Sequence, residues 1–406
     1  MRVLMLGWEF PPFKSGGLGT ACYDLTKGLA RRGVDVTFVM PFAPDNSKAE
    51  FVRLRGTREY AKHIKITHVD TVLTPYKTAT QYDAEHHVNT AGTSGKDVYG
   101  KDLFTEVERY TAAAMRIAMD EPHDVIHAHD WMTYKAGILA SKKTKKPLVV
   151  HIHATEFDRT GGSPNSHISH REFEGLDAAD LVIANSNWTK QNVMHHYKIP
   201  SSKIAVVHWG IEEDRPEYHL NHRSVINDNE KVVLFLGRVT LQKGPDYFVE
   251  TAAKVLQHEK NVRFLVAGNG DMLPRTIRRA ADLGLADKMN FLGFLDGADV
   301  HRAFQMADLY VMPSVSEPFG LVALEALKNG TPVLMSKQSG VSEVVHNALK
   351  TDFWDVDEMA NKIVNVLRHP ALQHELGQNG RKEADKFTLD GPAHKVEECY
   401  KRVMER

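Results

Sequence analysis

The chain has 406 residues, of which 42% are hydrophobic and 25% are charged, and its formal net charge is -1. This length favours two domains, each large enough to bury a core. The balanced charge gives no bulk attraction to nucleic acid, so nucleic acid is not an expected partner.

The N-terminal sequence MRVLMLGWEFPP carries one basic residue and a short apolar run that is broken by Glu9, which predicts a strand and not a secretory signal. No run approaches the ~18 apolar residues that a transmembrane segment needs. Two cysteines, Cys22 and Cys399, are too few for a disulfide framework and are typical of a reducing compartment. We therefore expect a cytoplasmic protein; the oligomeric state cannot be read from the sequence.

Short apolar runs alternate with helical patterns along the whole chain. They predict strands at 2–6, 34–40, 124–129, 147–153, 180–186 and 203–208, and then at 231–237, 262–268, 289–294, 308–314 and 332–336. Runs nearly continuous in Val, Ile and Leu are typical of parallel sheets with helices on both faces.

The polar segment 208–231 lacks periodicity and separates the two series of strands. It predicts an α/β protein of two doubly wound parallel-sheet (Rossmann-like) domains, 1–209 and 210–388, with the boundary near Gly210. Residues 389–406 predict one more amphipathic helix.

In open α/β sheets, ligands bind outside the carboxyl ends of the strands. After the first strand, Gly16, Gly17 and Gly19 precede a helical pattern that begins near Thr20. Adjacent glycines allow close backbone approach, and a helix N-terminus offers N–H groups to a phosphate. The spacing is neither G-x-G-x-x-G nor a Walker motif, which disfavours NAD and P-loop nucleotide binding. A plain flexible turn is the alternative.

Two cations follow the first strand of the second series. Arg238 and Lys243 stand with Gly237 and Gly244 before a helix that Pro245 or Asp246 would start. A guanidinium fork and a compact ammonium near a helix N-terminus suit a diphosphate. Two solvated loop cations are the alternative.

The stretch SVSEPFGLVALEALKNG places Glu317 in a loop and Glu325 about one turn inside the next helix. The first amides of that helix have no intrahelical partner, and the Glu325 side chain would lean back toward the helix start. Both carboxylates could therefore accept sugar or ribose hydroxyls. Favourable interaction with the helix dipole, worth ~0.3–1 kcal/mol, would explain one of the two glutamates without any ligand.

Histidines end two strands of the first series. His127 and His129 are two residues apart before Asp130, and His151 and His153 repeat that spacing on the next predicted strand. Each pair shares a strand face, so a zinc site is conceivable, although 22 histidines make such pairs unremarkable by chance. Otherwise these side chains are candidates for substrate binding or proton transfer, with Asp130 as the nearest base.

Other catalytic signals are weak. The chain has no G-x-S-x-G motif, and neither cysteine has a base partner that the sequence indicates. The cluster KKTKKP, residues 142–147, is best interpreted as a solvated helix end.

Taken together, KSGGLG, HDW, HIHAT, GRVTLQKG and EPFGLVALEALKNGTPV resemble, in order and over nearly the whole chain, retaining glycosyltransferases of the GT-B fold, family 4, with its E-x7-E motif. KSGGLG, HDW and QKG also resemble glycogen and starch synthases. However, GLVALEALKNGTP and SKQSGVSEVV follow the broader family 4 pattern, and the TGGL segment of bacterial starch synthases is missing.

The resemblance implies two domains facing a central cleft, with the C-terminal helix, about 389–406, packing back on the first domain. It also implies a role for each candidate residue. Donor binding would fall to Gly16, Gly17, Arg238, Lys243, Glu317, Phe319, Gly320, Leu321 and Glu325. In particular, Glu325 would bind the ribose, Arg238 and Lys243 the diphosphate, and Glu317 the donor sugar. His153 would lie near the reacting carbon, and the acceptor side would comprise Glu9, His129, Asp130 and Trp131.

The expected reaction is transfer of a hexose, with glucose favoured, from an ADP-, UDP- or GDP-sugar to a carbohydrate acceptor such as a glucan. His153, Arg238, Lys243 and Glu317 would be its catalytic groups. Cations stabilise the leaving diphosphate, so no cofactor and no metal is expected, and no D-x-D motif stands where it would hold one. A nucleotide-sugar epimerase, a sugar phosphorylase, or a nucleotide-sugar binding protein without turnover are the alternatives.

Overall fold

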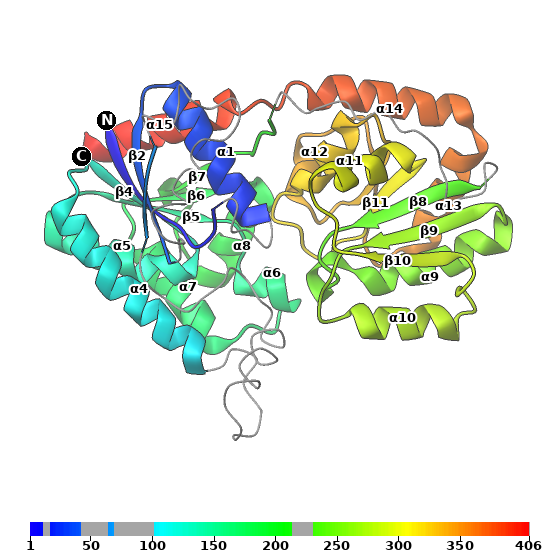
Figure 1. The fold of residues 1–406 in the computed structure, drawn as a ribbon, viewed down its shortest axis with the longest axis horizontal. Coiled ribbons are helices and arrows are strands. Elements are labelled where there is room, and N and C mark those ends of the chain that lie inside the picture. The colour runs from blue at the N-terminus through cyan, green and yellow to red at the C-terminus, as the bar shows by residue number, and fades with distance from the viewer. Residues whose placement is uncertain (11–16, 42–63, 69–100, 213–229, 406) are drawn as a thin grey trace. The chain divides into compact units, whose positions relative to one another are not determined.

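The computed structural model describes residues 1–10, 17–41, 64–68, 101–212 and 230–405 (Figure 1). The chain divides into two compact units. The first comprises Met1–Glu156, Pro164–Gly210 and Leu389–Arg406, and the second comprises Phe157–Ser163 and Ile211–Thr388. The switch from one unit to the other at 210/211 lies next to the predicted boundary, whereas the transfer of residues 157–163 to the second unit has no signal in the sequence.

The first unit is built on a seven-stranded sheet with the order β3-β2-β1-β4-β5-β6-β7. Its strands are β1 (Arg2–Leu6), β2 (Asp35–Met40), β3 (Ile64–His68), β4 (Val125–His129), β5 (Leu148–Ile152), β6 (Leu181–Ala184) and β7 (Ile204–Val206). Every neighbouring pair is parallel. The strand order reverses between β1 and β4, which is the switch point of a doubly wound sheet.

Helices cover this sheet on both faces, as the apolar strands predict. They are α1 (Gly17–Arg31), α4 (Lys101–Asp120), α5 (Trp131–Thr144), α7 (Ser166–Ala178), α8 (Asn187–Tyr197) and α15 (Asp390–Met404). The C-terminal helix α15 packs against α1, so the two ends of the chain lie side by side (Figure 1). Gly28 permits this approach, because a Cβ there would lie 2.8 Å from the Cβ of Ala393.

The second unit has a six-stranded parallel sheet with the order β10-β9-β8-β11-β12-β13. Its strands are β8 (Lys231–Leu236), β9 (Val262–Ala267), β10 (Met289–Gly293), β11 (Leu309–Met312), β12 (Val333–Ser336) and β13 (Leu349–Thr351). The order reverses between β8 and β11. The prediction of two doubly wound parallel-sheet units is thus confirmed.

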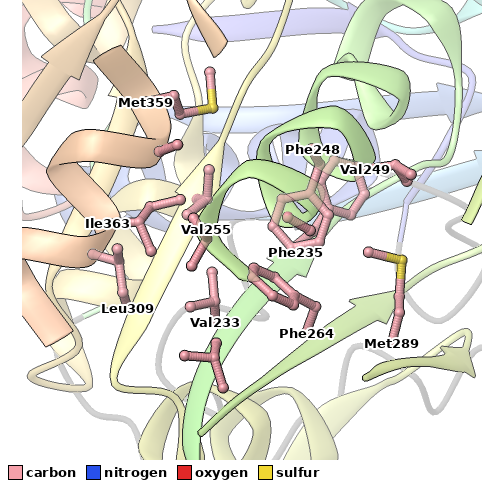
Figure 2. Packing of buried hydrophobic residues seen from close by; sticks show 14 of the residues in the cluster. Val233, Phe235, Phe248, Val249, Val255, Phe264, Met289, Leu309, Met359 and Ile363 are labelled. Carbon is pink, nitrogen blue, oxygen red and sulfur yellow. The ribbon is translucent and has the colours of Figure 1, made fainter. Parts of the chain in front are cut away.

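Helices α9 (Pro245–His258), α10 (Leu273–Asp282), α11 (Gly297–Met306), α12 (Leu321–Lys328), α13 (Val356–Arg368) and α14 (Pro370–Ala384) cover the second sheet. Its core forms where α9 and α13 pack on the strands (Figure 2). Phe248 of α9 contacts Phe235 and Phe264 of β8 and β9, with ring centroids 5.6 and 5.8 Å apart. Each buried aromatic or aliphatic side chain contributes about 1.5–3 kcal/mol, so this core fixes α9 on the sheet.

Candidate active site

The predicted donor-binding residues of the second unit gather at its switch point. Arg238 and Lys243 follow β8, and Glu317 follows β11, the strand next to β8 in the sheet. Crevices at the carboxyl ends of two such strands are the usual ligand sites of open α/β sheets. The topology therefore brings together three residues that are up to 79 positions apart, since Glu317 minus Arg238 is 79.

The short loop between β8 and α9 fixes the position of Lys243 at this edge of the sheet. Leu241–Lys243 forms one 3-10 turn, Gly244 has φ 67°, and α9 begins with Pro245. A left-handed residue followed by Pro at the first helical position is a favourable helix start. A Cβ on Gly244 would lie 2.1 Å from the carbonyl oxygen of Pro313, so only glycine lets the β8–α9 loop approach the exit of β11 this closely.

Lys243 and Glu317 form an ion pair in which Nζ lies 2.5 Å from Oε2. The side chains are 18% and 7% exposed, so the pair is largely shielded from solvent. Ser314 Oγ donates to the same carboxylate oxygen at 3.0 Å. The sequence assigned these two residues to one ligand, and the structure adds that each neutralises the other when they are in contact.

Arg238 is exposed, and its Nη2 donates to Gln242 Oε1 at 3.4 Å. Gln242 itself is buried, and its carbonyl oxygen accepts from the amide of Val315 at 2.9 Å. The buried glutamine thus links the guanidinium to the loop that follows β11. An exposed guanidinium near a half-buried ammonium can meet a diphosphate without breaking any core contact.

The loop that carries Glu317 is fixed by backbone hydrogen bonds to the loop after β12. The Glu317 amide donates to Gln338 O at 2.9 Å, Gly340 N donates to Glu317 O at 2.9 Å, and Val341 N donates to Phe319 O at 2.7 Å. Rigid backbone on both sides of Glu317 leaves its side chain little freedom to move away from the site.

Helix α12 begins directly after this loop at Leu321. Gly320, with φ 108°, is its N-cap, and no side chain caps the helix start. Phe319, the remaining predicted member of this turn, is buried. The turn therefore presents backbone to whatever binds at the mouth of the helix, as the sequence predicts.

The buried Tyr310 is influenced by the charges of both Glu317 and Glu325. Burial raises the pKa of the Tyr310 phenol well above its usual value, and the charges of Glu317 and Glu325 raise it further. The phenol donates to the carbonyl oxygen of Leu236, the last residue of β8, at 3.1 Å. Both carboxylates of the E-x7-E motif thus act on one buried hydroxyl at the switch point.

In the first unit, His129 is the last residue of β4 and Asp130 follows it, while His153 directly follows β5. The strands β4 and β5 are neighbours in the sheet. His129 Nδ1 lies 2.9 Å from His153 Nε2, and the His153 amide donates to Asp130 Oδ1 at 2.8 Å. Asp130 has φ 57° and ψ 167°, a conformation that costs a non-glycine residue of order 1–3 kcal/mol. Such strain at a strand end is typical of functional sites.

Glu9 also lies at this end of the first sheet, after β1, and is fully buried. Burial raises the pKa of the Cys22 thiol well above its usual value, and the charges of Asp130 and Glu9 raise it further, so both carboxylates lie near this cysteine. Trp131, the first residue of α5, is buried. Gly17 is the first residue of α1, three positions before the predicted start, whereas Gly16 lies outside the described residues.

Among the described residues, two groups of side chains at this site could ligate a metal ion. One is Cys22 with His129 and His153, and the other is His127 with His129 and His151. Within each group the ligand atoms lie within 4.8 Å of one another. The imidazole rings of His127 and His151 are stacked with an interplanar angle of 9°. Ring nitrogen lone pairs lie in the ring plane, so stacked rings direct them along parallel planes and not onto one ion. The group of His127, His129 and His151 therefore holds a metal poorly, and the expectation that no metal is required stays a prediction.

Sequence reasoning missed several residues that shape the site. Ser314 and Gln242 contact the candidate side chains, and the charges of both glutamates raise the pKa of Tyr310, yet each is a common residue type with no motif spacing. Trp209 stacks on His151 and His153. Its only sequence signal is a large apolar residue in an otherwise polar segment.

Among the described residues, no helix is both long and apolar enough to cross a membrane.

Two doubly wound parallel units, with polar groups at both switch points, define the GT-B class of fold. Solved structures agree. Sucrose-phosphate synthase from Thermosynechococcus elongatus matches with a TM-score of 0.77 at 19% identity over 100% of this chain and 99% of its own. Anabaena HepE in complex with UDP and glucose matches with a TM-score of 0.70 at 20% identity over 99% and 100% of the two chains.

Sequence comparisons identify the family. The family described as "Glycosyltransferase Family 4" matches residues 15–215, and "Glycosyl transferases group 1" matches residues 219–383. The uncharacterized glycosyltransferase MJ1607 of Methanocaldococcus jannaschii is 31% identical over 100% of this chain and 99% of its own length. The D-inositol 3-phosphate glycosyltransferase of Mycolicibacterium smegmatis is 32% identical over 75% and 73%. The chain belongs to the family 4, group 1 glycosyltransferases, enzymes that transfer a sugar from a nucleotide sugar.

Proposed function

We propose that this enzyme transfers a hexose, most simply glucose, from a nucleoside-diphosphate sugar to a hydroxyl of a carbohydrate or polyol acceptor, with retention at the anomeric carbon. The observation that carries the proposal is the arrangement of Arg238, Lys243 and Glu317 at the β8/β11 switch point. Two cations and a shielded carboxylate suit the two halves of a nucleotide sugar, the diphosphate and the hexose hydroxyls.

In this reaction the bond between the anomeric carbon and the diphosphate oxygen breaks, and a bond to the acceptor oxygen forms. Negative charge grows on the leaving diphosphate, where Arg238 and Lys243 stabilise it. The acceptor proton passes to the leaving phosphate on the same face of the sugar, which gives retention. No group in this scheme requires a metal ion or another cofactor.

The other candidate residues take supporting roles in the proposal. Glu325 holds the ribose hydroxyls. Glu317, with the backbone of Phe319, Gly320 and Leu321, holds the sugar. Gly16 and Gly17 contribute backbone to phosphate binding, and His153 acts beside the reacting carbon. The acceptor is held by the first unit through Glu9, Asp130 and Trp131, and the fully buried His129 acts on this side through its contact with His153.

The donor is proposed to be a UDP-sugar, because the solved structures of HepE contain UDP with glucose and UDP-glucose. ADP- and GDP-sugars are the alternatives to test. Two acceptor classes have support. The sequence features shared with glycogen synthases favour a glucan. Relatives 32–33% identical over 299–326 residues are named D-inositol 3-phosphate glycosyltransferase, which favours a phosphorylated cyclitol.

The test begins with thermal-shift titrations of ADP, UDP, GDP and their sugars, because a ligand that binds only the folded state raises the melting temperature with concentration. Transfer assays then use the donor that binds, with glucans, simple sugars and inositol phosphate as acceptors. Arg238→Ala, Lys243→Ala and Glu317→Ala should each lose transfer by about a hundredfold while staying folded. Lys254→Ala removes a cation from an exposed ion pair with Asp357 and is the matched control. Near wild-type turnover in all three site variants would refute the proposal.

A further inference from the structure

Five aromatic rings of the first unit form a stacked column at the ends of β4 and β5. His129 lies opposite His151 in the parallel register, so the alternation of side chains puts His127, His129, His151 and His153 on one face of the sheet. Trp209 is the fifth ring and packs on His151 and His153. Its ring is stacked on His151 at 5.1 Å with an interplanar angle of 2°, and on His153 at 5.4 Å and 19°.

His153 is the member of the four that is partly exposed, whereas the other three histidines are fully buried. Its backbone is held on both sides, by Asp130 Oδ1 at the amide and by Asn185 Nδ2 at the carbonyl oxygen, at 2.8 and 3.0 Å. The position of its Cα is therefore fixed, and only the side-chain torsions decide where its ring nitrogens point.

Two neighbours restrict those torsions. The ring of His151 lies 4.5 Å from that of His153 with an interplanar angle of 18°, and Trp209 stacks on both rings. Stacking sets the plane of the His153 ring. A turn of 180° about the Cβ–Cγ bond keeps this plane and exchanges the two edges of the ring, and the contact of 2.9 Å between His129 Nδ1 and His153 Nε2 selects one of the two orientations.

The same contact selects the tautomer. Burial lowers the pKa of His129 to about 3, so this imidazole is neutral and carries one proton. Its Nε2 is buried and has no hydrogen-bond partner among the residues that the structure describes. Buried N–H groups without an acceptor are rarer than buried acceptors without a donor, which places the proton of His129 on Nδ1. His129 Nδ1 therefore donates to His153 Nε2, and neutral His153 carries its own proton on Nδ1.

We propose that His129 and Trp209 are positioning residues for His153, in which Trp209 fixes the plane of the ring by stacking and His129 fixes its rotation and its Nδ1–H tautomer by hydrogen bonding. His153 then carries its ring proton on Nδ1, and Nδ1 is the ring atom from which it would donate to the sugar or to the acceptor. The catalytic part of this inference rests on the proposed function, whereas the tautomer does not.

The first experiment needs no substrate. The protein is labelled with 15N-histidine, and long-range 1H–15N correlation spectra distinguish protonated from bare ring nitrogens, with the His153→Gln spectrum assigning the resonances of residue 153. We expect a neutral His153 with its proton on Nδ1 in the wild type. In His129→Leu the two tautomers should mix. A wild-type His153 protonated on Nε2, or a His129→Leu spectrum unchanged at His153, would overturn the proposal even if the enzyme transfers sugar as proposed.

The second experiment distinguishes loss of the His129–His153 hydrogen bond from a general disturbance of packing around residue 129. An Asn side chain places an N–H where His129 has Nδ1, whereas Gln extends beyond that position. We therefore expect kcat to fall about ten- to hundredfold in His129→Gln and His129→Leu, with the donor KM little changed and activity largely restored in His129→Asn. Trp209→Phe should keep most of kcat because it retains a ring, and Trp209→Leu should not.

A double-mutant comparison completes the test. In a His153→Ala background, His129→Leu should have no further effect on kcat, because the residue it positions is gone. Full additivity of the two losses would mean that His129 acts independently of His153, and it would overturn the positioning role. His195→Gln, an exposed histidine on α8, is the matched control and should leave kcat unchanged.

Discussion

Lys243 Nζ and Glu317 Oε2 lie 2.5 Å apart, so the two side chains expected to hold opposite halves of the donor hold each other. The pair preorganises both groups at the switch point, and Ser314 adds a third hydrogen-bonding partner. Breaking a shielded pair leaves a charge without its counterion, whereas removing both charges does not. Stability and activity can therefore be separated by experiment.

Lys243→Met should lower the free energy of unfolding by about 1–3 kcal/mol, because the Ser314 hydroxyl is then the remaining hydrogen-bond partner of the Glu317 carboxylate among the described residues. Adding Glu317→Gln should recover most of that loss but none of the transfer activity. Urea denaturation and the transfer assay measure the two quantities. Equal instability of the single and the double variant would show that the pair contributes packing and not charge neutralisation.

Gly244→Ala should be much more damaging than its size suggests. The added Cβ would meet Pro313 O at 2.1 Å, and φ is 67°. The left-handed conformation alone costs about 1–2 kcal/mol, and the clash displaces Lys243 from Glu317. We expect a loss of more than 2 kcal/mol in the free energy of unfolding, together with loss of transfer.

Gly284→Ala is the matched control for this prediction. Gly284 has φ 69°, nearly the same backbone conformation, and a Cβ there would meet nothing within 4 Å. Gly284→Ala should lower the free energy of unfolding only by the conformational strain, about 1–2 kcal/mol, and should leave kcat unchanged. If both variants lose the same stability and keep the same activity, the close approach of the β8–α9 loop to β11 has no role in holding Lys243.

Arg238→Lys should not be a conservative change. The exposed guanidinium is held through Gln242, and a planar fork can bind a diphosphate at two points where an ammonium binds at one. We expect Arg238→Lys to weaken nucleoside-diphosphate binding about tenfold, and Arg238→Ala more, with no change in melting temperature without ligand. Calorimetric titration with UDP measures the affinity. Wild-type affinity in Arg238→Lys would mean that only its charge matters.

Within the described part of the chain, the sequence predicts eleven of the thirteen strands, because strands buried on both faces are nearly continuous in Val, Ile and Leu. It misses β13, Leu349–Thr351, which is three residues long and of mixed polarity. It also misses β3, an edge strand whose sequence IKITH alternates between apolar and polar residues. Edge strands need less apolar sequence than central ones, so this signal is weaker by nature.

The candidate site is predictable in part for a related reason. Strand ends are visible in a sequence, so Arg238, Lys243 and Glu317 can be placed at the carboxyl edge of the second sheet, and His153 at the carboxyl edge of the first. The sequence does not show which side chains these residues contact in the folded protein. The Lys243–Glu317 ion pair joins residues 74 positions apart, and the stack of Trp209 on His151 depends on where an aperiodic segment returns to the sheet. Such contacts follow from tertiary packing.

The buried histidines make the first unit sensitive to acid. Burial lowers the pKa of His127 and His151 well below their usual value and that of His129 to about 3. Below pH ~6.5 the unfolded chain binds protons at these three positions and the folded chain does not. Stability is therefore complete above pH ~6.5 and falls progressively as the pH decreases toward ~3.

Between pH 7.5 and 5.5 these three histidines together should lower the free energy of unfolding of the first unit by on the order of a few kcal/mol. Urea denaturation followed by tryptophan fluorescence measures it, since four of the five tryptophans lie in this unit. His151→Phe keeps a ring in the stack and should reduce the loss by about one third. Paired carboxylates such as Asp124, whose pKa is lowered by its hydrogen bond with Arg2, titrate below this range and do not contribute. Equal unfolding midpoints at the two pH values would mean that the folded chain gains as many protons at these histidines as the unfolded chain does, contrary to their burial as neutral rings.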